Sequence, residues 1–270
     1  MLQIHHEFCK DNRIETAPII WRVPSSRNAI IKRLIQMSDD LFALSPLDGR
    51  YRSETEALRE YFSEFAYVRQ RVRIETAYLI ALGRDIHLVR EPTSNEMDLL
   101  KNLSDSFSPE DAQQVKELEK VTRHDVKAIE RFLRSKLGGT SLSDLLETIH
   151  FGLTSEDVNN IAQAIALREA RDQIIIPALN KILHPLAELI KAHKSTLMPA
   201  RTHGQTAVPT TFGKEMAVFY ARLKKQEARM AEHRFEAKLN GAVGNFNAVR
   251  AAAPQVDWMA FSDKFIRDLG

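Results

Sequence analysis

Residues 58–82 carry the strongest structural signal in the chain, because their apolar side chains recur with the spacing of an α-helix. Apolar residues occupy positions 58, 61, 62, 65, 68, 72, 78, 79 and 82. Spacings of three and four residues place these side chains along one face of a helix. The pattern predicts a helix from Leu58 to Leu82, with Gly83 as its C-terminal stop.

Other segments also have helix signals, and no segment alternates between strand and helix patterns. One predicted helix begins at Ser108-Pro109-Glu110-Asp111 and ends at Gly138-Gly139. A second begins at Thr154-Ser155-Glu156-Asp157 and runs through Ile190, with kinks at Pro177 and Pro185. A third extends from about Thr211 to Leu239, and a fourth begins near Val256 after Pro254. Glycine supplies only 10 of 270 residues, about half its usual share of ~7%, which disfavours turn-rich sandwiches, barrels and nucleotide-binding α/β folds. The sequence therefore predicts an all-α fold.

The lengths of these helices indicate an elongated helical bundle. Helices of roughly 25 to 35 residues exceed the average of about 12 and are typical of long helices that share one seam. Too few helices are present to enclose such a seam, and the sequence stops soon after a new apolar segment begins, so we expect the bundle to be incomplete in this chain. We expect a doubtful leader at 1–36, a smaller N-terminal helical domain at 37–147, and the first part of a central helical-bundle domain at 148–270.

Residues 1–36 show no regular spacing of apolar residues, and we therefore interpret them as a leader and not as part of the fold. Met37 opens Met-Ser-Asp-Asp-Leu just before the first patterned segment, so the simplest interpretation is that Met37 is the natural start. A transit peptide is the alternative: the six basic residues before Met37 suit one, whereas Glu7, Asp11 and Glu15 do not. We expect a cytoplasmic protein, with organelle targeting by residues 1–36 left open.

Charge and cysteine content narrow the classes of partner. Cys9 is the only cysteine, so the chain cannot form an internal disulfide. No apolar stretch approaches the roughly 18 to 20 residues that span a membrane. The net charge of +2 provides no broad positive field for nucleic acid. We therefore expect neither a membrane nor a nucleic acid as partner.

Three segments concentrate polar residues that a helical bundle does not itself require. They are Thr122-Arg123-His124-Asp125, His150-Phe151-Gly152-Leu153-Thr154-Ser155-Glu156-Asp157 and Arg201-Thr202-His203-Gly204-Gln205. His203 lies between two prolines and beside Gly204, which predicts a loop histidine that can act as an acid or base. His124 and Asp125 are expected inside a helix, either as an oriented imidazole–carboxylate pair or as an exposed pair.

Two other patterns have simpler interpretations. Thr154 and Ser155 can bind an anion through their hydroxyls and the free N–H groups of a helix start, or they can be ordinary caps. Residues 240–245, Asn-Gly-Ala-Val-Gly-Asn, lack the full dinucleotide-binding glycine pattern and predict a turn. No histidine pair has metal-binding helix spacing beside a carboxylate base, so we expect no metal; a metal phosphohydrolase built on His124 and Asp125 lacks recognisable further ligands.

Five motifs, in order along the chain, together resemble the adenylosuccinate lyase family of the fumarase/aspartase superfamily. They are Leu44-Ser-Pro-Leu-Asp-Gly-Arg-Tyr51, His124-Asp-Val-Lys-Ala-Ile-Glu130, Thr154-Ser-Glu-Asp-Val-Asn-Asn160, Arg201-Thr-His-Gly-Gln205 with Gly213-Lys-Glu215, and Lys238-Leu-Asn-Gly-Ala-Val-Gly-Asn245. The similarity extends from about Phe42 to Gly270 and is to the N-terminal portion of the longer bacterial and plant form.

The resemblance implies a homotetramer whose active sites combine residues of several subunits. It implies release of fumarate from adenylosuccinate, giving AMP, and from SAICAR, giving AICAR, in purine biosynthesis and without a cofactor. His203 would be the general acid and His124 would assist it. The substrate-binding residues implied are Arg50 and Tyr51 at the nucleotide phosphate, Thr154 and Ser155 at the succinyl carboxylate, and also Arg123, Asp125, Gln205 and Lys238.

The chain departs from the family pattern in three places. Arg123 stands where a smaller polar residue such as Asn is expected, and Thr206 replaces a frequent proline. The family's base is a serine in a Ser-Ser-x-Met-Pro-x-Lys-x-Asn segment, which does not occur in these 270 residues. We therefore expect the chain to be inactive alone. The alternative is a non-catalytic helical partner that assembles with full-length subunits.

Overall fold

The computed structural model describes residues 39–270, so the predicted leader and the predicted start at Met37 lie outside the described residues. The described residues divide into two units, a first one that ends at Thr55 and a second one that spans residues 56–270. The described part of the first unit contains a 3-10 turn, η1 (Asp39–Phe42), and a short helix, α2 (Arg52–Thr55). The Thr55 hydroxyl donates to the carbonyl of Leu47 at 2.9 Å and fixes the turn between them. The domain boundary expected at 147/148 stays a prediction.

The second unit begins with helices that pack around α4. Its elements up to residue 148 are η2 (Glu56–Leu58), α3 (Arg59–Phe62), α4 (Glu64–Arg84), α5 (Ser94–Asp105), α6 (Pro109–Thr122), α7 (Asp125–Leu137) and η3 (Ser143–Thr148). One core lies among α4 to η3 and includes Val72, Leu100, Ile129 and Phe132, all almost fully buried. These helices confirm the all-α class for this part of the chain.

The helix predicted at 58–82 is interrupted and longer than expected. Ser63 breaks it, because its extended backbone ends α3 and its hydroxyl accepts the Ala66 N–H at the start of α4. Gly83 is not the stop: α4 continues to Arg84. The glycine is needed for packing instead, since a Cβ there would lie 2.7 Å from the carbonyl oxygen of Arg90.

The single helix expected from 108 to 138 is in fact two helices. Its predicted start is confirmed, because Ser108 and Asp111 form a reciprocal capping box at the start of α6. The helix ends at Thr122, since Arg123 adopts the left-handed conformation with φ 52°, and His124 then caps α7. His124 therefore lies just outside the helix as its cap, and Asp125 is the first residue of α7 rather than a residue in the interior of one long helix.

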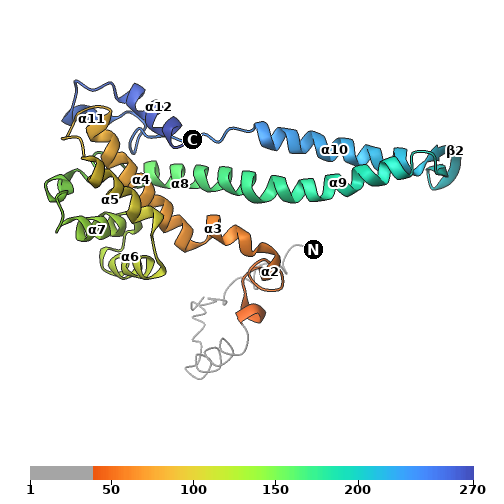
Figure 1. Cartoon of the computed structure of the whole chain (residues 1–270), viewed down its shortest axis with the longest axis horizontal. Helices are drawn as coiled ribbons and strands as arrows, with labels where there is room; N and C mark the ends of the chain where they lie inside the picture. Colours follow the sequence, from red (N-terminus) through yellow and green to blue (C-terminus); the bar gives the residue numbers. More distant parts are fainter. Residues whose placement is uncertain (1–38) are drawn as a thin grey trace, which may run out of the picture. The chain divides into compact units, whose positions relative to one another are not determined.

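The longest feature of the second unit is a helical hairpin (Figure 1). Its elements are α8 (Ser155–Ala170), the π-helical turn η4 (Arg171–Ile175), α9 (Ile176–Ala192), β1 (Leu197–Thr202), β2 (Gln205–Thr211) and α10 (Phe212–Glu232). The start predicted at Thr154 is confirmed, and α9 and α10 run side by side. The π turn ends two residues before Pro177, which has no backbone N–H to donate to the α-helical ladder.

Two features of the hairpin differ from the prediction. His203 lies in a turn, in agreement with the expected loop, but the residues on either side of it form an antiparallel two-stranded sheet that was not predicted. The helix expected to reach Leu239 ends at Glu232, after which the chain is extended. The Arg171 guanidinium binds the carbonyls of Met230 and His233 and thereby stabilises this helix end.

The C-terminal segment forms a second core with α4 and α8. It contains α11 (Asn247–Ala252), which was not predicted, and α12 (Trp258–Asp268), which begins after the Asp257 cap close to the predicted start. Tyr78, Phe261 and Phe265 pack with mostly edge-to-face rings at centroid distances of 5.6 to 6.1 Å. Residues 240–245 form the expected turns. No helix among residues 39–270 is long and apolar enough to cross a membrane.

Glycine 83 provides a test of this packing. We expect Gly83→Ala to lower the free energy of unfolding by about 1 to 3 kcal/mol, because the new methyl group would overlap the backbone of Arg90 and Glu91. Thermal and urea unfolding measure the change. Gly139→Ala is the matched control, since a Cβ there meets no atom within 4 Å and should leave stability unchanged or slightly higher. Equal effects at the two positions would contradict this account.

Candidate functional site

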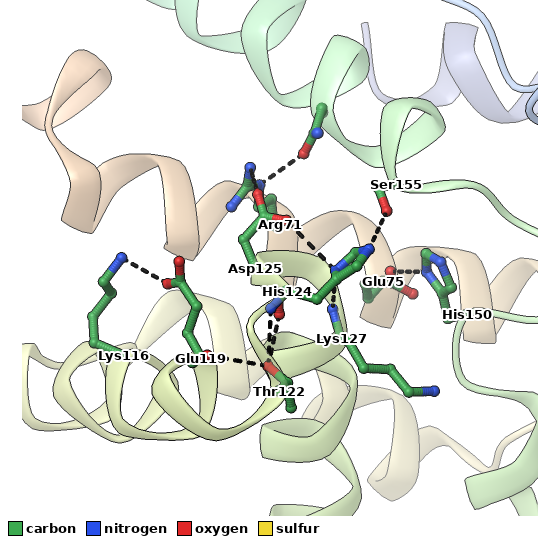
Figure 2. Close-up of polar contacts among 11 residues, drawn as sticks. Arg71, Glu75, Lys116, Glu119, Thr122, His124, Asp125, Lys127, His150 and Ser155 are labelled. Atoms are coloured by element: carbon green, nitrogen blue, oxygen red, sulfur yellow. Dashed lines mark hydrogen bonds and ion pairs between the residues drawn. The ribbon is translucent and has the colours of Figure 1, made fainter. Parts of the chain in front are cut away.

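The starts of α7 and α8 meet at His124 and Ser155 (Figure 2). His124 is the N-cap of α7, and its Nδ1 accepts the backbone N–H of Lys127 at 3.2 Å. Its Nε2 lies 3.4 Å from the Ser155 hydroxyl oxygen. Because Nδ1 is an acceptor, the neutral ring carries its proton on Nε2 and donates toward Ser155. This imidazole, the hydroxyl and the start of α8 can together bind an anionic group.

A buried arginine holds Asp125 beside this contact. Arg71 of α4 lies 2.6 Å from an Asp125 carboxylate oxygen and donates to Asn159 of α8 at 2.9 Å, while its guanidinium stacks 3.8 Å from the Tyr67 ring centre. Partial burial opposes ionisation of Asp125, but the Val126 N–H and the Arg71 charge outweigh it and lower the pKa of that carboxyl. Arg71 therefore fixes the starts of α7 and α8 relative to each other.

Lys238 is anchored at the start of α8 by a fully buried carboxylate. Its Nζ lies 2.9 Å from an Asp157 oxygen and 2.8 Å from the Gly241 carbonyl. Asp157 also accepts the N–H of Thr154 at 3.0 Å, which places the Thr154 backbone against the same group. Asn160 receives the Lys238 N–H at 2.7 Å. The motifs containing Thr154 and Lys238 thus meet in space.

Residues that the sequence analysis gave no role also belong to this region. The Glu75 carboxylate lies 2.6 Å from Nδ1 of His150, and the Glu75 side chain is 0% exposed. Burial opposes protonation of His150, but its hydrogen bond to Glu75 raises the pKa of the imidazole. The signal for Arg71 and Glu75 was present: both charges share a helix face with apolar residues of the 58–82 pattern, and a charge on such a face needs a buried partner.

His203 and Gln205 lie at the opposite end of the long hairpin. His203 and Gly204 are the two turn residues between β1 and β2, with φ values of 48° and 76°, and positive φ at both positions suits a two-residue hairpin. Both His203 and Gln205 are exposed. At about 1.5 Å per residue, the helical path from Ser155 to Ala192 is on the order of 55 Å long. Within one chain, the hairpin turn at β2 is therefore far from α8 (Figure 1).

The remaining predicted residues differ in their surroundings. Arg50 and Tyr51 lie in the first unit, where the guanidinium is 5.5 Å from the Tyr51 ring centre. Arg123 is exposed, and its side chain has no partner within residues 39–270. Its left-handed backbone explains why a residue such as Asn is expected there, since Asn tolerates this conformation better than Arg.

Residues 49–266 match the sequence pattern of the lyase family. This chain belongs to that family. It is 42% identical over 235 residues to an adenylosuccinate lyase of Buchnera aphidicola, 42% over 239 residues to one of Dictyostelium discoideum, and 40% over 233 residues to one of Escherichia coli K12. The alignments cover 85 to 86% of this chain and 51 to 52% of those proteins. The chain thus spans about half the length of these relatives, and its predicted resemblance is confirmed.

Solved structures confirm the helical fold of this chain. A fumarate lyase from Mesorhizobium sp. BNC1 superposes on this chain with a TM-score of 0.65 and 21% identity. The superposition covers 79% of this chain and 48% of the fumarate lyase. A β-carboxy-cis,cis-muconate cycloisomerase from Acinetobacter calcoaceticus superposes with a TM-score of 0.64 and 19% identity. This superposition covers 78% of this chain and 48% of the cycloisomerase. The helical bundle predicted from the helix lengths is therefore confirmed.

The Arg71–Asp125 pair predicts how acid affects stability. Because the folded state lowers the pKa of Asp125, this carboxyl contributes stability above its unfolded pKa and loses it as pH falls through the lower folded pKa. Asp125→Asn should reduce the free energy of unfolding by about 1 kcal/mol near neutral pH, a value discounted for its partial exposure, and by less in acid. Urea unfolding at several pH values measures this. The exposed Asp98→Asn is the control, and a pH-independent loss in Asp125→Asn would contradict the assignment.

Proposed function

We propose that this chain carries part of the active site of a lyase that releases fumarate from adenylosuccinate, giving AMP, and from SAICAR, giving AICAR. The observation that carries the proposal is the contact between His124 and Ser155 at the start of α8. It joins two of the five motifs that resemble adenylosuccinate lyases, and the relatives named above bear that name at 40 to 42% identity. We place the reaction in the cytoplasm, with targeting by residues 1–36 as the alternative.

Thr154 and Ser155 would hold the succinyl carboxylate. The first turn of α8 offers hydroxyls and a partial positive charge, both of which favour a carboxylate. His124 supplies an N–H beside Ser155, and Lys238 adds an ammonium group fixed by Asp157. Arg123 and Asp125 would contact the nucleotide from the start of α7, and Arg50 and Tyr51 would bind its phosphate from the first unit.

The reaction is a β-elimination and needs a base and an acid. A base removes the proton from the carbon beside a succinyl carboxylate, and the electron pair forms the double bond of fumarate as the carbon–nitrogen bond breaks. The departing purine-side nitrogen takes a proton from an acid, which we assign to His203 with Gln205 beside it. Binding the carboxylate at Thr154 and Ser155 stabilises the negative charge that develops before the bond breaks.

The site must combine copies of the chain, because His203 and Ser155 lie at opposite ends of the hairpin. The apolar surface of the hairpin supports such an assembly: Ile182 is 56% exposed, Phe219 53% and Ile175 39%. Side chains of this size normally pack against a partner when they line a long helix pair. We infer a homotetramer in which one subunit's hairpin turn approaches another subunit's α7 and α8.

We expect the 270 residues by themselves not to release fumarate, because the serine-containing segment that the resemblance assigns as base is not among them. The ultraviolet absorbance of fumarate, followed after adding adenylosuccinate to the purified chain, measures this. The positive control is the intact Escherichia coli enzyme at equal concentration. Turnover by the 270 residues alone would contradict the assignment of the base.

Mixing experiments separate the catalytic proposal from an assembly partner without catalytic residues. We expect this chain, refolded with Escherichia coli subunits whose histidine matching His203 is replaced by alanine, to restore fumarate release to at least tenfold above that variant alone. The same chain with His203→Ala is the matched control and should assemble without restoring activity. Equal activity with both chains would favour the partner that only assembles, an alternative that the exposed apolar residues of α9 and α10 also support.

A further inference from the structure

Glu75 is a buried carboxylate with one partner. Its side chain is 0% exposed, and its Oε1 lies 2.6 Å from Nδ1 of His150. Its Oε2 is also buried and has no hydrogen-bond partner within residues 39–270. A carboxylate removed from water requires a compensating charge. Among the described residues, only His150 is in a position to supply it.

The backbone holds His150 in an uncommon conformation. Its φ of 61° is left-handed, which is unfavourable for a residue other than glycine. Its carbonyl accepts the Leu153 N–H, and the Tyr78 hydroxyl donates to the Phe151 carbonyl at 3.0 Å. These contacts and the Glu75 bond fix the imidazole despite the strain. Its Nε2 has no hydrogen-bond partner in the described part of the chain, and the side chain is 19% exposed.

Three charged groups act on the His150 ring. Glu75 faces it from α4, and Glu130 and Lys127 act on it from α7, where those two residues pair at 2.6 Å. Burial opposes the cation, but the Glu75 bond and both glutamate charges raise the pKa of His150 against the smaller effect of Lys127. Lys127 also donates its backbone N–H to His124, so the Glu75–His150 pair adjoins the candidate site (Figure 2).

We propose that Glu75 is a positioning residue: it binds the Nδ1–H of His150, keeps the ring cationic, and leaves the Nε2–H as a donor for an anionic group of the nucleotide. This proposal rests on the proposed function for the identity of the ligand. Glu75 itself touches no ligand. Its effect passes through the charge and orientation of His150.

The charge of His150 is measured without any ligand. The test is ¹H–¹⁵N NMR of the imidazole nitrogens of the 270-residue chain against pH, with the His150 signal assigned by its loss in His150→Gln. In the wild type we expect His150 to be cationic with a proton on Nδ1 at neutral pH. In Glu75→Gln, which keeps the shape but removes the charge, its titration should move to lower pH. Glu227→Gln, a buried glutamate of α10, is the matched control.

A neutral His150 in the wild type at neutral pH would overturn the proposal without any variant. So would an unchanged titration in Glu75→Gln. Circular dichroism checks that the variants fold. If Glu75→Gln does not fold, the wild-type spectrum still decides the matter, because the proposal requires the cation there.

AMP is the probe for the role of this cation in binding. By calorimetry, Glu75→Gln should bind AMP about tenfold more weakly than the wild type at neutral pH. The variant should regain most of that affinity near about pH 5.5, where the His150 imidazole takes up a proton without help from Glu75. A purely structural role would leave the loss equal at every pH and would overturn the proposal. If the wild type itself does not bind AMP, the proposed function is contradicted, while the NMR titration still decides the role of Glu75.

Discussion

The buried carboxylate of Asp157 organises the candidate site. It accepts hydrogen bonds from Lys238 at 2.9 Å, from the Thr154 N–H at 3.0 Å and from the Gly241 N–H at 3.1 Å. A charge at 0% exposure persists because several donors replace its water, and those donors come from segments about 80 residues apart in sequence. The start of α8 and the segment after α10 are therefore held together by one side chain.

Helix α4 serves the site in a similar way from the other side. Its apolar residues enter both cores, and its two buried charged residues, Arg71 and Glu75, face α7, α8 and the segment at His150. Each charge is paired with a group on another element, so its burial sets the position of that element. Asp125 and His150 thereby receive fixed orientations before any ligand binds, which is the condition for a preorganised site.

The sequence predicted the positions where helices begin better than where they end. Ser108 with Asp111 and Thr154 with Asp157 are local signals, because a cap bonds residues only three positions away. The ends of α4 and α10 depend on distant contacts instead. Gly83 packs against Arg90, and Arg171 binds the carbonyls of Met230 and His233 at the end of α10. A periodic pattern cannot indicate such contacts, which is why both ends were placed wrongly.

The sequence by itself determined the all-α class, the capped starts of α6 and α8, and the family, because periodicity, caps and sequence motifs are properties of neighbouring residues. Only the tertiary structure brought His124 to Ser155 and Lys238 to Asp157, and only it revealed the pairing of Glu75 with His150. It also separated His203 from these groups by the length of a helical hairpin. Such relations depend on how helices far apart in sequence pack, and burial then selects the charged pairs that can exist between them.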